Sequence, residues 1–348
     1  MPVHCASESQ PATGQPLCSV CVANYNGTDF IASCLESVLS QEFDHPIEII
    51  VHDDASTDDS VAFIRNHFPN VKLLTSDNNV GFCVSNNRMV AEARGRFVLL
   101  LNNDATLFPD ALQTLHDYAV IQKRQGILGL PQYDMQTGEL IDIGSRLDLF
   151  LNPIPNLDRT RRQVGMVTGA CFWIPKWLWD ELGGFPEFFG SLAEDLYLSC
   201  VARLRGYSVE AVPQSGFRHW VGRSFGGGKI MTNSLHTTYH RRSMSERNKT
   251  FVMMLCYPAP YAYLIIPLHL VVLSVEGLLI SMIKRDLRLW NGIYLNCLNA
   301  LWATRETLLS SRTAIQQYRN TGLGFFSSHT LILHKLTMLR KYGLPSVE

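Results

Sequence analysis

The segment Phe97–Pro109, FVLLLNNDATLFP, limits most strongly how this chain can fold. Five consecutive apolar residues have the length and composition of a strand, and they end abruptly at Asn102, Asn103 and Asp104. An uninterrupted apolar run is typical of a strand that is covered on both faces, as in a parallel sheet. Because ligands of such sheets bind beyond the carboxyl ends of the strands, this oxygen-rich turn is the first candidate for an active site. A helix is expected to begin at Pro109.

Strand-like and helix-like segments alternate along the first hundred residues. The predicted strands cover residues 16–26, 47–54, 71–75 and 97–102, and the predicted helices cover residues 29–40, 58–67 and 84–93. Ser56 is expected to cap the second helix. Short connections between alternating elements predict an α/β fold with a mostly parallel central sheet. No GxGxxG follows the first strand, which argues against a dinucleotide-binding dehydrogenase.

The pattern becomes less regular after Gly126. Residues 131–165 carry turn residues and polar clusters, which are expected to form a small β excursion or a loop over the sheet. Beyond them we expect a strand over 167–175, helices over 176–184 and 191–205, and a strand with a loop over 209–220. Gly206 stands where a helix C-cap favours glycine.

Charge is distributed unevenly although the net charge is only −1. Residues 1–240 contain 17 Lys and Arg against 26 Asp and Glu, a balance of −9, whereas residues 241–348 contain 13 against 5, a balance of +8. A basic and apolar C-terminal third suggests contact with an anionic membrane surface, and the acidic remainder argues against a nucleic-acid partner.

Nine cysteines are scattered without the regular spacing of a disulfide framework, which favours a reducing, cytosolic setting. Cys18 and Cys21 form a CxxC within a predicted strand, where residues three apart point to opposite faces. We therefore expect both to be buried packing residues. Residues 1–15 have no apolar core and are expected to form a flexible tail.

An apolar stretch runs from Phe251 to Ile283, interrupted by prolines, a histidine and a glutamate. Three interpretations stay open: a membrane-associated segment that lies in the plane of the bilayer or re-enters it, a transmembrane helix, or a buried helical hairpin. We favour the first, with Lys284, Arg285 and Arg288 placed to meet lipid headgroups. The expected domains are a tail over 1–15, a catalytic domain over 16–240 and a helical C-terminal region over 241–348.

Acidic residues stand at three predicted loop positions: Asp53 with Asp54, Asp104, and Glu194 with Asp195. Each has a purely structural alternative, because aspartate, serine and threonine also suit turns and helix N-termini. Ser191 and Glu194 match the S-x-x-E capping box, which accounts for Glu194 but leaves Asp195 unexplained. The positive end of a helix favours the ionised form of a nearby carboxyl group, and that carboxylate can accept a proton from a hydroxyl.

Seven short motifs, in order over residues 16–224, resemble those of family 2 glycosyltransferases with the GT-A fold, and most closely the bacterial rhamnosyltransferase-like members. The motifs are Tyr25-Asn26; Asp53-Asp54-Ala55-Ser56-Thr57-Asp58-Asp59-Ser60; Asn79-Val80-Gly81-Phe82 with Asn86-Asn87; Asn102-Asn103-Asp104; Thr168-Gly169-Ala170; Gly183-Gly184-Phe185 with Glu194-Asp195; and His219-Trp220-Val221-Gly222-Arg223-Ser224. Each motif alone is weak evidence for the family. The occurrence of all seven in the family's order makes the resemblance specific.

The resemblance implies a fold, a reaction and a role for each motif residue. The fold would be a nucleotide-diphospho-sugar-binding domain with a mostly parallel sheet, followed by a helical membrane-associated region. Asp195 would be the general base of an inverting sugar transfer, and Asp104 with His219 would hold Mg²⁺ or Mn²⁺. Asp53 would contact the nucleobase and the Gly81 loop would lie against the nucleotide. The other expected donor-binding residues are Tyr25, Asn26, Asp54, Asn87, Asn103 and Arg223, and the expected acceptor-binding residues are Gly169 and Glu194.

The resemblance also implies partners and a location. It favours dTDP-rhamnose as the donor, with a UDP-sugar as an alternative, and a lipid-linked glycan acceptor at the cytoplasmic face of a bacterial inner membrane. Arg223 to Lys229 would form either a lid over the donor or a plain flexible loop. Two departures stand out: Pro186 replaces the usual aspartate after Gly-Gly-Phe, and Asn102 leaves Asp104 as the only charged residue of its motif.

Two other functions are compatible with parts of this pattern. A non-catalytic scaffold in a membrane assembly complex would not need Asp53, Asp104, Asp195 and His219 together. A sugar nucleotidyltransferase usually has a phosphate-cradling glycine-rich loop after the first strand, which Tyr25-Asn26-Gly27 does not supply.

Overall fold

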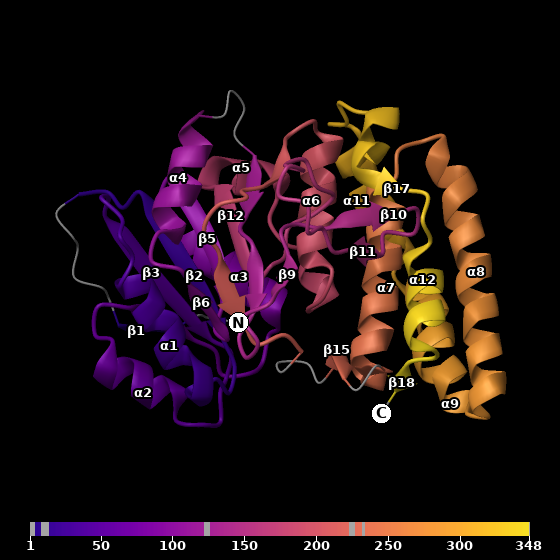
Figure 1. Ribbon diagram of the computed structural model, residues 1–348, viewed down its shortest axis with the longest axis horizontal. Helices are drawn as coiled ribbons and strands as arrows, with labels where there is room; N and C mark the ends of the chain where they lie inside the picture. The colour runs from indigo at the N-terminus through magenta and orange to yellow at the C-terminus, as the bar shows by residue number, and fades with distance from the viewer. Residues whose placement is uncertain (1–3, 8–13, 122–125, 223–226, 232–233, 348) are drawn as a thin grey trace. The chain divides into compact units, whose positions relative to one another are not determined.

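The computed structural model describes residues 4–7, 14–121, 126–222, 227–231 and 234–347, which form two compact units (Figure 1). Unit 1 comprises residues 1–145, 155–198 and 207–220. Unit 2 comprises residues 146–154, 199–206 and 221–348.

An eight-stranded sheet forms the centre of unit 1, with the strand order β1-β4-β3-β2-β5-β12-β7-β13. Strands β2, β3, β4 and β5 are mutually parallel, as the alternation of strands and helices predicts, whereas β1 and β12 run antiparallel to their neighbours. The strands are β1 His4–Ser7, β2 Cys18–Asn24, β3 Ile47–Asp53, β4 Lys72–Thr75, β5 Phe97–Asn102, β7 Ile127–Gly129, β12 Cys171–Pro175 and β13 Val209–Ala211.

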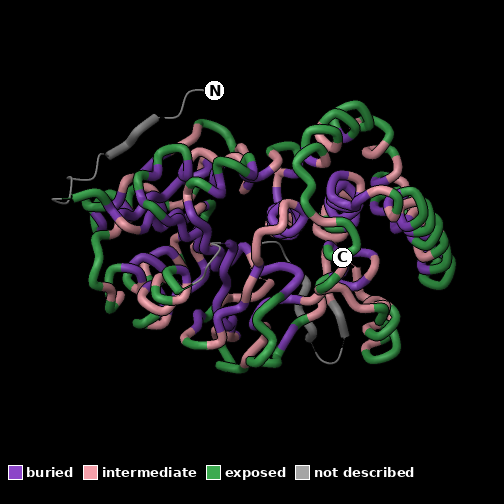
Figure 2. The backbone as a smooth tube through the Cα atoms, turned by 90° about the horizontal axis from the view of Figure 1, so that it is seen from above, coloured by how far each residue is buried: buried purple, intermediate pink, exposed green. Residues whose placement is uncertain are grey.

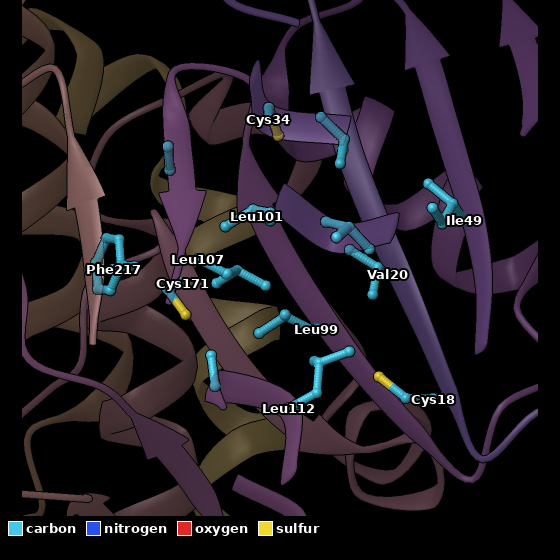
Figure 3. Close-up of a cluster of buried hydrophobic side chains, with 14 of the residues drawn as sticks. Cys18, Val20, Cys34, Ile49, Leu99, Leu101, Leu107, Leu112, Cys171 and Phe217 are labelled. Atoms are coloured by element: carbon cyan, nitrogen blue, oxygen red, sulfur yellow. The ribbon is translucent and has the colours of Figure 1, made fainter. Parts of the chain in front are cut away.

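Helices connect these strands, and their apolar faces pack on the sheet. They are α1 Thr28–Leu39, α2 Ser60–His67, α3 Phe82–Glu92, α4 Ala111–Ile121, α5 Lys176–Leu182, the 3₁₀ helix η1 Glu187–Phe189, and α6 Glu194–Leu204. Figure 3 shows the core on one face, where Val20, Leu99 and Leu101 from the strands lie with Cys34 of α1 and Leu112 of α4. Because strand side chains alternate between faces, the run of apolar residues in β5 is buried on both sides.

Cys18 and Cys21 are both fully buried free thiols in β2, as expected. Cys18 belongs to the core of Figure 3, and Cys21 does not. Burial raises the pKa of both thiols, which agrees with an inert packing role.

A second, four-stranded sheet in unit 1 has the order β6-β14-β8-β9. Its strands are β6 Ala105–Leu107, β14 Phe217–His219, β8 Gln132–Asp134 and β9 Leu140–Asp142. Residues 131–165 were expected to form either a small β excursion or a loop over the sheet, and this sheet is the β excursion. Strand β14 pairs with β6 and β8, which places His219 opposite Ala105 and Asp134.

Three helix starts differ from the expectations. The helix expected at Pro109 begins two residues later, at Ala111. Ser56 does not cap α2, which begins at Ser60, because its hydroxyl donates to Asp53. The helix expected over 191–205 begins at Glu194, since Leu192 and Ala193 adopt left-handed φ angles of 69° and 65°.

Unit 2 is mainly helical. Its helices are α7 Tyr239–Cys256, α8 Tyr261–Lys284, α9 Leu287–Leu289, the π-helix η2 Trp290–Leu295, α10 Asn296–Ala303, α11 Arg305–Gln316, the 3₁₀ helix η3 Leu323–Ser328, and α12 His334–Tyr342. Two small sheets accompany them: β11 Pro153–Ile154, β10 Arg146–Asp148 and β17 His329–Thr330 form one, and β15 Gly227–Met231, β16 Ser234–Thr237 and β18 Ser346–Val347 form the other.

The apolar stretch over 251–283 divides between the end of α7 and the long helix α8. Helix α8 continues through Pro267 for 24 residues, and an 18-residue window within it has a mean hydropathy of 2.1, so the helix is long and apolar enough to cross a membrane. Only 33% of that apolar window is buried (Figure 2). Helix α8 is therefore only partly buried within this chain.

Candidate active site

The carboxyl ends of β2, β3 and β5 bring three polar side chains together at one edge of the sheet. The three strands are adjacent and parallel, so Asn24, Asp53 and the turn after Asn102 meet there. Asn24 Nδ2 donates to Asp53 Oδ2 at 2.8 Å, and Asn103 Nδ2 donates to Asn24 Oδ1 at 2.8 Å. Through Asn24, this chain of hydrogen bonds links the Asp53 motif to the Asn102-Asn103-Asp104 motif.

Asp53 is buried and accepts hydrogen bonds only from neutral groups among its recorded contacts. Its Oδ1 accepts from the Ser56 backbone N–H at 2.9 Å, and its Oδ2 accepts from the Ser56 hydroxyl at 2.7 Å. The Ser56 hydroxyl in turn accepts from the Asn26 N–H at 2.8 Å. Ser56 therefore fixes the orientation of Asp53 and ties the Tyr25-Asn26 turn to it.

Asp54 holds the glycine loop. Its two carboxylate oxygens accept from the backbone N–H groups of Val80 at 2.7 Å and Gly81 at 2.8 Å. Gly81 has φ 88°, which favours glycine, and an added Cβ would lie 3.2 Å from the Gly190 carbonyl oxygen. Asp54 thus positions the loop from within the protein.

Gly27 is required for a different reason. Its φ of −106° is open to any residue, but a Cβ there would lie 2.1 Å from Asn24 Oδ1 and 2.3 Å from Asn103 Nδ2. The link between Asn24 and Asn103 therefore depends on the absence of a side chain at this position.

Asp104 and His219 come together because β6 and β14 are paired, which places the residue before Ala105 beside His219. His219 Nε2 lies 3.0 Å from Asp104 Oδ1 and 3.3 Å from Asn102 Nδ2. The other ring nitrogen, Nδ1, lies 3.0 Å from Gln132 Nε2 on β8. The imidazole is thus held from both sides, and Asp104 is 98% buried beneath it.

This pair supplies one oxygen and one nitrogen donor for a divalent ion. In the part of the chain that the structure describes, no three histidine, cysteine, aspartate or glutamate side chains gather closely enough to hold a metal by themselves. Among the residues that the structure describes, none offers a hydrogen bond to the buried Asn102 Oδ1, which adds a potential oxygen ligand beside the pair. The donor set therefore fits an ion that takes its remaining ligands from a bound diphosphate.

Asp195 lies at the N-terminus of α6, against the Thr168-Gly169-Ala170 turn. Its Oδ2 accepts from the Gly169 N–H at 2.8 Å, and its Oδ1 accepts from the Leu196 N–H at 2.7 Å. Desolvation raises the pKa of this carboxyl, and the two amide hydrogen bonds oppose the shift without cancelling it. A raised pKa makes the carboxylate a stronger base, although part of the residue remains exposed.

Gly169 lies close to both acidic side chains of the motif. A Cβ added to Gly169 would lie 3.6 Å from Asp195 Oδ2 and 3.7 Å from Glu194 Oε1. Glu194 itself is buried as the first residue of α6. The two expected acceptor-binding residues therefore adjoin the expected base.

The remaining candidates are placed in three different ways. Tyr25 is 51% exposed at the sheet edge. Asn87 uses its amide to hold the Gly-Gly-Phe turn, because Oδ1 accepts from Phe185 N–H at 3.0 Å and Nδ2 donates to Phe185 O at 2.9 Å. Arg223, and with it the start of the expected lid, lies outside the described residues.

Two residues that complete the site were not among the sequence-based candidates. Asn24 joins Asp53 to Asn103, and its place near the carboxyl end of the strand predicted over residues 16–26 was an available indication. Gln132 contacts His219 only because β8 and β14 are neighbours. No local sequence pattern predicts the pairing of β8 with β14.

With the geometry described, comparison with known proteins defines the class of fold. A structure of GalNAc-T7 with UDP, GalNAc and Mn²⁺ superposes with a TM-score of 0.56 at 16% identity, covering 72% of this chain and 49% of that chain. TarS of S. aureus in complex with UDP gives a TM-score of 0.51 at 17% identity, covering 86% and 90%. The fold is the GT-A type expected from the sequence, with a mostly parallel sheet and a helical C-terminal region.

The family match is more specific. Residues 19–179, somewhat less than half of the chain, match the family model described as glycosyl transferase family 2. Chondroitin synthase of Escherichia coli is 33% identical over 32% of this chain and 16% of its own length. The N-acetylglucosaminyl-diphospho-decaprenol L-rhamnosyltransferase of Mycobacterium tuberculosis is 26% identical over 54% of this chain and 71% of its own. For the first four curated relatives, the match spans between 16% and 32% of their length.

Proposed function

We propose that unit 1 transfers a sugar from a nucleoside-diphosphate donor to an acceptor hydroxyl, with inversion at the anomeric carbon. The observation that carries this proposal is the polar edge formed by Asn24, Asp53 and Asn103, followed directly by the Asp104–His219 pair. The first three suit a nucleoside, since they offer fixed acceptors and amides. The last two suit the diphosphate end, since they offer ligands for a cation.

Asp195 is the base in this proposal. Its carboxylate takes the proton of the acceptor hydroxyl, whose oxygen then bonds to the anomeric carbon as the bond from that carbon to the diphosphate oxygen breaks. The Gly169 and Leu196 amides orient the carboxylate, and burial strengthens it as a base. The nucleoside diphosphate is the leaving group, so the charges balance.

Asp104 and His219, with Asn102 beside them, are the residues that would hold Mg²⁺ or Mn²⁺ together with the diphosphate. Such an ion would supply neutralisation of the charge on the departing diphosphate. Gln132 keeps the imidazole of His219 turned toward Asp104.

The donor and acceptor are proposed from the relatives. The relative named N-acetylglucosaminyl-diphospho-decaprenol L-rhamnosyltransferase aligns over 54% of this chain. This match supports dTDP-rhamnose as the donor and a lipid-linked glycan as the acceptor. A UDP-sugar is the alternative donor, because UDP is bound by the TarS structure. We place the reaction at the cytoplasmic face of a bacterial inner membrane, in cell-surface glycan synthesis.

A panel of nucleotide sugars with Mn²⁺ tests the proposal. The true donor is expected to raise the melting temperature of the full chain, since a ligand that binds only the folded state stabilises it. Product analysis with that donor should then show release of the nucleoside diphosphate and glycosylation of a lipid-linked acceptor. Binding without turnover on any acceptor would favour the scaffold, and formation of a nucleotide sugar from a sugar phosphate and a nucleoside triphosphate would identify a nucleotidyltransferase.

A further inference from the structure

Helix α8 has two faces of different character. One face is buried in unit 2, and it carries the residues Ala262, Ile265, His269, Leu273, Gly277, Ile280 and Ser281. The opposite face is apolar and exposed, and it carries Tyr263, Leu264, Leu268, Val271, Val272, Val275, Leu278, Leu279, Met282 and Ile283. We call this second set the outer stripe. Leu264 near one end is 74% exposed and Met282 near the other is 71% exposed, so the stripe runs the length of the helix.

The buried face of α8 is fixed by close packing and by hydrogen bonds. An added Cβ on Gly277 would lie 2.4 Å from the ring of Tyr294, so the helix approaches η2 closely. His269 Nε2 lies 2.9 Å from the Thr250 hydroxyl on α7. Burial lowers the pKa of His269 to about 3, so the imidazole is neutral there.

Glu276 binds α8 to the helices beside it. Its carboxylate lies 2.9 Å from Arg242 on α7 and 2.8 Å from Lys335 on α12. Lys335 also contacts Glu246 of α7 at 2.5 Å, and Glu246 lies 2.8 Å from Lys249. This ion-pair network, Arg242, Glu246, Lys249, Glu276 and Lys335, holds three helices together.

The network restricts how α8 can meet a membrane. Glu276 stands eight residues before the end of α8, about 12 Å along the axis, so a spanning helix would place it well inside a hydrocarbon layer of about 30 Å. Because its partners are on α7 and α12, those charged helices would have to enter the hydrocarbon as well. Burial of several charged and polar segments in lipid is strongly unfavourable.

The charge of the surrounding surface identifies the occupant of the outer stripe. The network contains three cations and two carboxylates, so its charges nearly cancel. Most of the net charge of +8 carried by residues 241–348 therefore lies outside the network. Lys284 and Arg285 follow the outer stripe and are exposed, and Arg340 and Lys341 are exposed at the end of α12. An apolar stripe with adjacent cations complements a bilayer with anionic headgroups.

We infer that α8 lies in the plane of an anionic membrane surface, with its outer stripe among the acyl chains and its cationic end at the phosphates. The helix does not cross the bilayer. The inference concerns unit 2 alone and does not depend on which sugar, if any, unit 1 transfers.

Vesicle flotation of the full chain tests the binding surface. Binding to vesicles of phosphatidylcholine with phosphatidylglycerol is expected, with weaker binding to phosphatidylcholine alone. Met282→Glu should reduce partitioning at least roughly tenfold, because a carboxylate would have to leave water. Ile121→Glu on α4, an exchange at an 82% exposed apolar residue elsewhere, is the matched control and should leave binding unchanged. Equal loss in both variants, or no loss in either, would overturn the assignment.

A depth measurement distinguishes a helix in the plane from a spanning helix. Single cysteines at Leu264, Val271 and Met282 would carry a fluorophore that is quenched by brominated lipids at known depths. The native cysteines from Cys18 onward are all buried, and Cys5 is replaced by serine in every variant. Similar, shallow depths at all three positions are expected. A deep Val271 between shallow ends would show a spanning helix, and no quenching together with a dimer in light scattering would show that a second copy covers the stripe.

Discussion

The carboxylates of the candidate site in unit 1 and those of the ion-pair network in unit 2 have different partners. In unit 1, Asp53 and Asp195 accept their recorded hydrogen bonds from amides and hydroxyls. In unit 2, Glu246 and Glu276 are paired with lysine and arginine side chains. Neutral donors orient a carboxylate but leave its charge in place, whereas a cation cancels it.

Under the proposed function, this difference matches the roles of the two sets of residues. A carboxylate without a cationic partner can attract a metal ion or accept a hydroxyl proton, as the proposed sugar transfer would need. The paired charges of unit 2 have no such capacity left, and they join α7, α8 and α12 into one body. The five predictions below test the contrast, beginning with the largest expected effect.

Replacing Asp195 by asparagine should reduce sugar transfer by about 10²- to 10⁴-fold, the usual contribution of a positioned general base. Donor affinity should stay nearly constant, because the amide oxygen still accepts from a backbone N–H. Steady-state kinetics and calorimetry measure the two quantities. Asp180→Asn, at an exposed carboxylate paired with Lys176, is the matched control. Unchanged turnover in the Asp195 variant would remove this residue from the mechanism.

Loss of the Asp104 carboxylate should uncouple donor binding from metal. In Asp104→Ala, calorimetric titrations of the donor with and without Mn²⁺ should coincide, whereas the wild type should bind at least roughly tenfold more tightly with the ion. Asp110→Ala, on the same chain segment but paired with Ser215, serves as the comparison. If the Asp104 variant kept the wild-type difference, the ion would have other ligands.

In unit 2, Glu246→Gln should lower the free energy of unfolding by about 3 kcal/mol, because it leaves Lys249 and Lys335 without their shared carboxylate. Hydrogen exchange of the backbone amides in α7 and α12 measures this loss of stability locally. As a control, Lys284→Gln at an exposed cation should change the free energy of unfolding by less than about 0.5 kcal/mol. Equal exchange rates in wild type and the Glu246 variant would mean that the network does not stabilise the unit.

The same glutamate predicts a pH dependence. The neighbouring lysines and arginine hold the pKa of Glu246 well below its ordinary value of 4.5, against the opposing effect of burial. Its contribution is therefore complete above about pH 4.5 and is lost as the pH falls toward the pKa of the folded state. Asp195 has the opposite sign, because its raised pKa makes protonation favour the folded state. Acid should thus loosen α7 and α12 in the wild type, and Glu246→Gln should flatten that response.

The smallest effect is expected from Asn24→Ala. Asp53 would lose one of three donors, which should cost about 1–2 kcal/mol of stability, measured by denaturant titration. Nucleotide affinity should fall as Asp53 and Asn103 lose their common anchor. Ser33→Ala, at an exposed hydroxyl on α1, should be neutral. A neutral Asn24 variant would show that Ser56 alone orients Asp53.

Local patterns predicted the parallel sheet because its strands are apolar on both faces and end in polar turns. Strand β6 was missed because Ala105–Leu107 is a strand only through its pairing with Phe217–His219, more than a hundred residues later. The same pairing joins Asp104 to His219, which motif order suggested and periodicity alone did not. The start of α6 was misjudged since Leu192 and Ala193 adopt left-handed backbone angles that such residues rarely take.

Gly27 has a consequence for anyone who maps this protein by mutagenesis. The position has no functional group, contacts no proposed ligand and has an ordinary backbone angle, so a survey of chemistry would pass over it. Yet a single methyl group there would occupy the space where Asn24 meets Asn103. Alanine at Gly27 would therefore imitate an active-site lesion. In a saturation screen, intolerance to substitution at Gly27 would show that the position has no room for a side chain. It would not show that Gly27 takes part in the chemistry.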